Sequence, residues 1–385
     1  MRKLSRRHAL QTVAGLGLTL PCAAALAQPQ TPRETKNFTT TLTGLVASSG
    51  VDIERVETFE LVPADRPWQK NLGHIAKGQH VTFLLNGKWW MSKEAGLWVE
   101  PGLAFFAKVG NSPIYNPMRN TGTYTAPEGG MLSIARGTGD FINEQGELFP
   151  TMETYLAEEG HIEGVAIFWK GEVLDGLYRI SSQGDAGGAL ASEINRLNET
   201  ETLPPGWHNH YLFGDGGIFT QPESGHICCN THKNVGILQY PLSLPLKEQT
   251  KLHWKWTAEK LPSDVAEDAL ITHDYLSIAV EFDDGQDITY MWSSELPIGK
   301  VFRCPIPMWN PIETHVVQRN DPALIGKELT EERDLFADYH AHIGGPAQNI
   351  TRIWLIANTV FMRQNGKCCY RDIEIEQDRK RTRVL

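Results

Sequence analysis

The sequence predicts an all-β protein made of two jelly-roll-like β-sandwich domains joined by a short helical linker. Short alternating runs such as "HVTFLLNGKWW" and "YLSIAVEFDDG" are typical of half-buried strands, and long stretches with a 3.6-residue period are scarce. The 385 residues exceed what one hydrophobic core usually serves, so two domains are expected.

The best helix candidate, "DAGGALASEINRLNETE" (185–201), lies between two strand-rich regions and sets the domain boundary. We expect a cleaved signal peptide (1–27), a first sandwich (28–183) and a helical linker (184–202). A second sandwich (203–378) and a basic tail (379–385) follow.

The N-terminal stretch is typical of an export leader. Arg6 and Arg7 precede an apolar run that ends in Ala25-Leu26-Ala27, a small-x-small cleavage signal. The paired arginines indicate the twin-arginine route, which carries folded proteins and so favours a cofactor or a fast-folding chain. The alternative is a membrane anchor, but the run is short and broken by Gly and Pro. We expect a periplasmic or secreted protein without a membrane span.

The charge balance excludes one class of partner. Loss of residues 1–27 removes four of the 36 basic residues and no acidic one, so the mature charge is 32 − 46 = −14. Nucleic-acid binding needs clustered Lys and Arg, so it is not expected. The expected partner is a carbohydrate or another small molecule, and the oligomeric state stays open.

Five cysteines remain after cleavage, among them two adjacent pairs in "HICCNTH" and "GKCCYRD". In an oxidising compartment they should pair, leaving one over. Neighbours in a strand point to opposite faces, so one thiol of each pair could form a disulfide inside the sandwich while the other faces out. Structural disulfides, buried thiols and a redox or metal role all remain open.

The N-terminal half contains a sandwich-like pattern over residues 57–170. Trp68 is followed by the strand "HVTFLL", and "GGMLSIARGTGDFINEQGEL" places Gly130, Leu132 and Ile134 before a loop with Asn143 and Gly146. This region resembles galactose-binding lectins of the PA-I type and related sandwich modules. The resemblance implies a sugar-facing loop, but Arg136 stands near the position of a calcium-holding carboxylate. A scaffold sandwich without a ligand is the alternative.

The C-terminal half resembles domain-of-unknown-function family 3047. The matching stretches are "LPPGW", "LHWKWTAEKLP", "THDYLSIAVEFDDGQDITYMWSSELPIG", "ERDLFADYHAHIGG" and "YRDIEIE". The resemblance implies a jelly-roll sandwich akin to carbohydrate-binding modules and polysaccharide-lyase folds, and it implies no reaction. The sequence departs from the family before its last strand, where Asn358 stands in a segment without a carboxylate.

Histidine is concentrated in this half, which holds nine of the 13 histidines. Two pairs have His-x-His spacing, in "HNH" (208–210) and "HAH" (340–342). In a strand such spacing puts both imidazoles on one face, so two facing strands could complete a divalent metal site. The metal ligands expected on this reasoning are His208, His210, His340 and His342. Tyr211 would lie on the opposite face from the first pair.

Three functions fit these patterns. The first is an exported lyase or hydrolase acting on a polysaccharide or glycoside; an elimination needs a group that neutralises the carboxylate and a base such as His or Tyr. The second is a non-catalytic carbohydrate-binding protein. The third is a metal- or thiol-dependent enzyme on a small molecule, with chemistry at Cys228-Cys229. The candidate catalytic residues are His208, His210, Tyr211, His226, His232, Lys233 and Tyr339.

Substrate binding is assigned to residues of both domains, namely Asp140, Asn143, His253, Lys255 and Asp274. Trp254 and Trp256 share one face of "LHWKW", which we expect to be core, so that His253 and Lys255 line the opposite surface. Asp274 is expected at the mouth of a strand, where its charge stays solvated.

Overall fold

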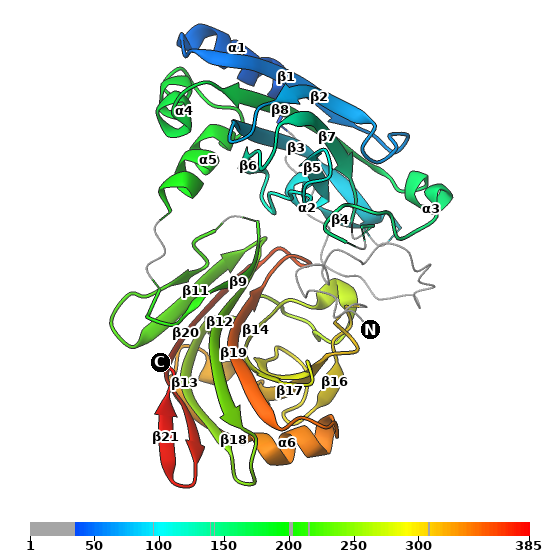
Figure 1. Ribbon diagram of the computed structural model, residues 1–385. Coiled ribbons are helices and arrows are strands. Elements are labelled where there is room, and N and C mark those ends of the chain that lie inside the picture. The colour runs from blue at the N-terminus through cyan, green and yellow to red at the C-terminus, as the bar shows by residue number, and fades with distance from the viewer. Residues whose placement is uncertain are drawn as a thin grey trace. The chain divides into compact units, whose positions relative to one another are not determined.

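The computed structural model describes residues 35–94, 96–138, 140–141, 143–199, 203–214, 216–306 and 309–385. The expected leader lies outside these residues. The chain divides into two compact units at residues 199/200. Strands dominate both units, so the all-β prediction is confirmed (Figure 1). No helix among the described residues is long and apolar enough to cross a membrane.

The first unit contains two sheets. The larger has the order β1-β8-β3-β4, with β6 paired to β3; the smaller has the order β2-β7-β5. The strands are β1 (Ile53–Leu61), β2 (Lys70–Ile75), β3 (His80–Ser92), β4 (Leu97–Val99), β5 (Phe105–Val109), β6 (Thr121–Thr125), β7 (Gly130–Arg136) and β8 (Gly160–Trp169). Two short helices, α2 (Pro101–Ala104) and α3 (Met152–Leu156), lie between strands.

Three helices share a hydrophobic core with the larger sheet of this unit. They are α1 (Phe38–Ser49), α4 (Val173–Ser181) and α5 (Ala189–Asn198). Leu42, Leu177 and Leu190 are fully buried together with Val165 and Ile167 of β8. Helix α5 lies within the stretch expected to be a linker, and it packs here because its apolar positions form one face.

The second unit is a β-sandwich. One sheet has the order β10-β11-β20-β13-β18, with β21 paired to β20, and the other has the order β16-β17-β15-β14-β19-β12-β9. The first sheet contains β10 (Phe219–Thr220), β11 (His226–His232), β13 (Lys251–Lys260), β18 (Leu329–Asp334), β20 (Asn365–Gln377) and β21 (Lys380–Arg383). The seven-stranded sheet contains β9 (His208–Phe213), β12 (Val235–Pro245), β14 (Tyr275–Phe282), β15 (Asp287–Trp292), β16 (Val301–Arg303), β17 (Glu313–Arg319) and β19 (Asn349–Asn358).

Neighbouring strands of the seven-stranded sheet are antiparallel except β15 and β17, which are parallel. Helix α6 (Leu335–His342) and the short turns η2 (Leu270–Thr272) and η3 (Pro322–Leu324) complete the second unit.

The alternation in β13 sets the core of this sandwich. Trp254 and Trp256 are each 1% exposed and pack with residues of both sheets, which confirms that the Trp face is core. The expected basic tail is also structured: β21 pairs with β20, Val384 and Leu385 are buried, and Trp207 Nε1 donates to the Val384 carbonyl at 3.0 Å.

Strand β14 is buried along its whole length, on both faces. Leu276, Ile278 and Val280 belong to the core between the sheets. The other face, with Tyr275 and Ser277, is equally buried although it points away from that core. The seven-stranded sheet therefore has a covered outer face, and this face carries polar side chains.

Candidate metal centre

Two histidines and a cysteine converge beside the outer face of the seven-stranded sheet. His273 follows η2, Cys304 follows β16, and His315 lies in β17. One ligand-capable atom of each lies within 4.8 Å of the others, and all three residues are 0% exposed. Three soft or borderline ligands thus meet in a buried space. His273 comes from one part of the chain, and Cys304 and His315 come from the end of β16 and from β17, which are neighbouring strands.

A hydrogen bond to a backbone carbonyl orients the His273 ring. Its Nδ1 donates to the Glu267 carbonyl oxygen at 2.6 Å, since a carbonyl can only accept. Its Nε2 therefore presents a lone pair, and this atom lies 3.4 Å from Cys304 Sγ. Burial, and then His315, lower the pKa of His273 to about 3, so the ring is neutral. A neutral imidazole whose second nitrogen is held by a carbonyl is the usual state of a metal-ligating histidine.

His315 is the least satisfied of the three. Its ring stacks on Phe302 with centroids 5.0 Å apart and meets the Tyr275 ring edge-on at 4.9 Å. Neither ring nitrogen makes a hydrogen bond with a described residue. A buried polar group left in this way costs roughly 1–3 kcal/mol, so an additional partner is physically favoured.

Glu313 places a carboxylate next to this ring. Its Oε1 lies 3.4 Å from His315 Nε2 and accepts from Tyr275 Oη at 3.1 Å and Thr289 Oγ1 at 3.2 Å. Burial by itself raises the pKa of Glu313, but His315, His273 and Cys304 together lower it to about 2.

Cys304 has the properties of a ligand rather than of a nucleophile. Burial, and then Glu313, raise the pKa of its thiol well above the ordinary value, whereas reactive cysteines have a lowered pKa and some exposure. A bound cation is the agent that makes such a thiol ionise. These properties do not support a nucleophilic role for Cys304.

The distance between two of the ligand atoms suits a tetrahedral ion. With a metal–sulfur distance of about 2.3 Å and a metal–nitrogen distance of about 2.0–2.1 Å, adjacent ligands are about 3.6 Å apart. The 3.4 Å between His273 Nε2 and Cys304 Sγ is close to this value. Imidazole with thiolate favours zinc or copper over calcium or magnesium.

The predicted pair His208 and His210 lies in β9, on the outer face of the same sheet. His208 is opposite Gln239, Gln239 is opposite Trp354, and the His210 ring stacks on Trp354 at 5.4 Å. The expectation that Tyr211 faces the other way is wrong. A bulge at His210 returns Tyr211 to the face of His208, where Tyr211 is buried.

The second predicted pair, His340 and His342, lies in helix α6 and not in a strand. Residues two apart in a helix point about 200° apart, so this pair does not offer two ligands to one side. His342 Nε2 is 3.9 Å from Asp338 Oδ1, and the His340 ring packs on Phe336. Among the described residues, the group of metal-type ligands contains none of the four predicted histidines.

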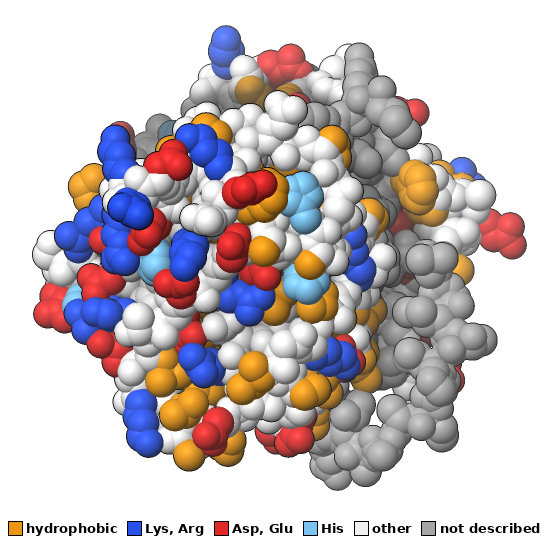
Figure 2. Space-filling view, turned by 90° about the horizontal axis from the view of Figure 1, so that it is seen from below, with side chains coloured by type: hydrophobic (Ala, Val, Ile, Leu, Met, Phe, Trp, Pro, Cys, Tyr) orange, Lys and Arg blue, Asp and Glu red, His pale blue; other side chains and the backbone are white. Residues whose placement is uncertain are grey.

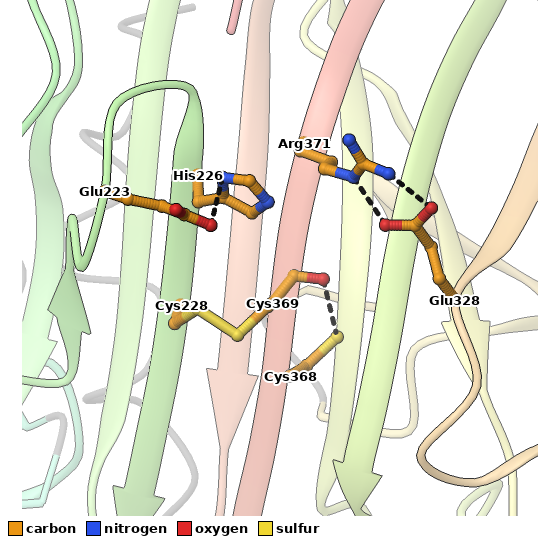
Figure 3. Close-up of a disulfide and its surroundings, with 7 residues drawn as sticks. All are labelled: Glu223, His226, Cys228, Glu328, Cys368, Cys369 and Arg371. Atoms are coloured by element: carbon orange, nitrogen blue, oxygen red, sulfur yellow. Dashed lines mark hydrogen bonds and ion pairs between the residues drawn. A yellow bond between two sulfur atoms is a disulfide. The ribbon is translucent and has the colours of Figure 1, made fainter.

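The remaining catalytic candidates lie on separate elements. His226 begins β11 and pairs with Glu223 at 3.2 Å, as Figure 3 shows. His232 ends the same strand, with Nδ1 3.3 Å from the Gln364 carbonyl, and Lys233 follows in the turn with φ 59°. Tyr339 of α6 donates to Asp284 Oδ2 at 2.6 Å. These contacts stabilise local structure and form no common cluster with β9.

The substrate-binding candidates of the second unit are engaged in ion pairs or buried. His253 Nε2 is 3.2 Å from Glu376, and Lys255 Nζ is 2.8 Å from Asp372. Charges of both signs are interspersed on the surface in Figure 2. The expectation that Asp274 stays solvated is wrong: it is 0% exposed and accepts from the backbone N–H groups of Phe361 and Met362 at 3.0 and 2.7 Å.

In the first unit, Asp140 and Asn143 shape their own loops. Asp140 Oδ2 accepts from the Thr138 N–H at 2.7 Å, and Asn143 Oδ1 accepts from the N–H groups of Gln145 and Glu147, both at 3.1 Å. Arg136, which replaces the expected carboxylate, is fully buried and pairs with Glu158 at 2.8 Å.

The disulfide connects outward-facing cysteines. Cys228 of β11 and Cys369 of β20 are bonded (Figure 3). Both are only partly buried, while Cys229 and Cys368 are buried. The expectation of a disulfide inside the sandwich is wrong for this bond. Cys228 is also unavailable as a thiol, and burial raises the pKa of Cys229 to about 12, which argues against thiol chemistry at this pair.

The patterns in the sequence did not predict the central residues of this cluster as metal ligands. His273, Cys304, Glu313 and His315 occur in "THDY", "FRCP" and "ETHVV", with no ligand spacing between them. One signal was present: an odd cysteine count left one thiol over, and Cys304 is the only cysteine after residue 27 without a cysteine neighbour.

Comparison with known proteins finds a family match that spans this cluster. Residues 217–374 match the family described as protein of unknown function (DUF3047). The predicted resemblance of the C-terminal half is thereby confirmed over these residues, which include all four residues of the cluster. No curated protein matches the chain.

Several solved structures match at low similarity. The xyloglucanase domain of NopAA, a type three effector from Sinorhizobium fredii in complex with cellobiose, is 9% identical, with 45% of this chain and 93% of that chain covered and a TM-score of 0.29. A carbohydrate-binding module of the beta-sandwich superfamily is 8% identical, with 85% and 100% covered and a TM-score of 0.23. AerE from Microcystis aeruginosa is 8% identical, with 84% and 88% covered and a TM-score of 0.14.

Proposed function

We propose that the second unit is a metal-binding domain that holds one thiophilic divalent ion, with zinc as the best fit. The ligands are His273 Nε2, Cys304 Sγ and a ring nitrogen of His315, with Glu313 as the fourth ligand or as a neighbouring counter-charge. The convergence of these side chains in a fully buried space carries the proposal.

Charge balance supports a divalent ion. A Cys304 thiolate and the Glu313 carboxylate supply two negative charges, which neutralise a 2+ ion in an environment where an uncompensated charge is costly. The two imidazoles add neutral lone pairs. The His315 ring, whose nitrogens make no hydrogen bond with a described residue, gains a partner on binding.

The burial of the ligands supports a structural ion over a catalytic one. Catalytic zinc sites keep an open position for water or substrate, whereas structural sites are closed by four protein ligands. All three converging residues are 0% exposed, and Glu313 is 2% exposed. The ion would tie the start of β14 to β16 and β17, so its binding energy would become folding energy of the sandwich.

Export through the twin-arginine route, expected from Arg6 and Arg7, agrees with this role. That route transports proteins already folded, so a metal acquired in the cytoplasm would travel with the chain. The route stays a prediction, since the leader lies outside the described residues.

Elemental analysis of the purified full chain tests the proposal. We expect about one equivalent of metal in the unmodified protein and a loss of most of it in Cys304→Ser and His315→Ala. His226→Ala is the matched control, because His226 lies in the other sheet and forms an ion pair with Glu223. A metal-free protein after growth with zinc and copper, or equal metal content in all variants, would overturn the proposal.

The glycan-directed functions predicted from the sequence stay predictions. Their proposed catalytic residues are spread over β9, β11 and α6. The observation that favours a ligand at β9 is that His208 is exposed beside the His210–Trp354 stack. Binding and turnover assays with xyloglucan, cellulose fragments and uronate polymers test these functions separately from metal content.

A further inference from the structure

Two cysteine pairs face one another across β11 and β20. Cys228 is in register with Cys369, and the next residues, Cys229 and Cys368, are in register with each other. Only the first pair is bonded in the structure. Metal binding at the Cys304 cluster makes no use of the second pair.

The register puts the second pair in a geometry that a disulfide can span. Cys228 and Cys369 have Cα atoms 4.0 Å apart, which marks the narrow type of antiparallel pair. Narrow and wide pairs alternate, so Cys229 and Cys368 form a wide pair, with Cα atoms roughly 5.5 Å apart. Disulfides commonly join Cα atoms at this separation.

Both side chains of the second pair point to the same side of the sheet. Successive residues in a strand alternate faces, so Cys229 and Cys368 lie on the face opposite to the Cys228–Cys369 bond. They are 3% and 1% exposed and belong to the core between the two sheets. Cys368 Sγ makes a weak contact with the Cys369 carbonyl oxygen at 3.8 Å, drawn in Figure 3.

The two thiols also interact electrostatically. Burial raises the pKa of Cys368 well above its ordinary value, and Cys229 raises it further. Two buried thiols at this proximity have no strong hydrogen-bond partner to lose on oxidation, because thiols are weak donors.

We infer that Cys229 and Cys368 form a second cross-strand disulfide, on the core side of the bond between Cys228 and Cys369. The oxidant is a disulfide of the oxidoreductase or glutathione class in the compartment to which the chain is exported, and it acts while β11 and β20 are locally open. The two thiols lose two protons and two electrons, one sulfur–sulfur bond forms, and the oxidant's disulfide is reduced to two thiols.

This assignment completes the cysteine count of the chain after residue 27. Four cysteines form two stacked disulfides that lock β11 to β20, and Cys304 remains as the single thiol. The inference is independent of the metal proposal, since Cys304 takes no part in either bond.

Alkylation mass spectrometry tests the inference on the full chain. The protein is purified without reductant after export to an oxidising compartment, unfolded with an alkylating agent present, and cleaved after Lys and Arg. Cleavage produces peptides 197–233 and 368–371, which hold all four cysteines. We expect a linked pair of peptides that carries no alkyl group; a linked pair with two alkyl groups would overturn the inference.

Paired variants assign the bonds. In Cys228→Ser/Cys369→Ser, the same peptides should stay linked through Cys229 and Cys368. The matched control, Cys229→Ser/Cys368→Ser, should stay linked through the first pair. Complete alkylation of Cys229 and Cys368 in the first variant contradicts the inference, and if that variant fails to fold, the alkyl count of the unmodified protein decides.

Discussion

His273 divides its two ring nitrogens between two partners: Nδ1 donates to the Glu267 carbonyl at 2.6 Å, and Nε2 faces Cys304 Sγ at 3.4 Å. The first contact fixes the tautomer, so the second nitrogen is an acceptor aimed at a thiol. The same arrangement aims that lone pair at any cation held by the thiolate.

Metal removal should destabilise the second unit. An ion present at a hundredfold excess over its dissociation constant adds about 2.7 kcal/mol of stability. A strong chelator should therefore lower the melting temperature by roughly 5–10 °C. Differential scanning calorimetry with and without chelator measures the shift. Cys304→Ala should melt lower than the unmodified protein and be insensitive to chelator; an equal chelator effect in that variant would mean that the ion binds elsewhere.

The first unit should lose stability as the pH rises. Burial, and then Asp140, raise the pKa of Glu158 to about 8 from an ordinary 4.5, against the opposing effect of Arg136. The folded state holds a proton that the unfolded state releases, so the contribution of Glu158 to stability is fully present below about pH 4.5 and is lost as the pH rises to about 8. Denaturant titrations across this range measure the trend. Glu158→Gln, which cannot ionise, should flatten it, and a rise in stability over the same range would contradict this origin.

Asp274 should behave as a structural residue. Its two oxygens accept from the Phe361 and Met362 N–H groups, and burial raises its pKa to about 7. Asp274→Asn replaces one acceptor with a donor facing an N–H group, which should cost about 1–3 kcal/mol. Thermal unfolding checks the cost. An unchanged melting temperature with weakened ligand binding would instead support the binding role predicted from the sequence.

Substitution of His208 and substitution of His210 should affect stability to different extents. His208 is exposed, so His208→Ala should change stability by less than about 0.5 kcal/mol. His210 is half-buried on Trp354, so His210→Ala should cost about 0.5–1.5 kcal/mol. If β9 binds or processes a glycan, both variants should lose that activity per folded molecule. Full retention of activity in both would remove β9 from the site.

The sequence alone predicted the structure correctly where one local pattern decides the secondary structure and the buried face. Alternation in "LHWKW" correctly placed Trp254 and Trp256 in the core, and "HNHYLF" is a strand. It was insufficient where a single residue changes the register, because the bulge at His210 reverses the face of Tyr211. The "HAH" segment forms a helix and not the expected strand, because Asp334 caps the helix by accepting from the Ala337 N–H at 3.0 Å.

The metal ligands could not be found by spacing because pairing between separate segments brings them together. Cys304 is next to Glu313 through a backbone hydrogen bond of 3.1 Å, and His315 follows in the same strand. His273 arrives from another segment, and its orientation depends on the carbonyl of Glu267. Ligand spacing is informative when one strand or helix carries several ligands, and here each segment carries one or two.

X-ray absorption spectroscopy of the bound metal in the purified full chain tests the metal site most directly. We expect one sulfur neighbour at about 2.3 Å and two or three nitrogen or oxygen neighbours at about 2.0–2.1 Å, with the sulfur lost in any metal retained by Cys304→Ser. A spectrum with only nitrogen and oxygen neighbours, or one unchanged by Cys304→Ser, would contradict a centre built on His273, Cys304 and His315.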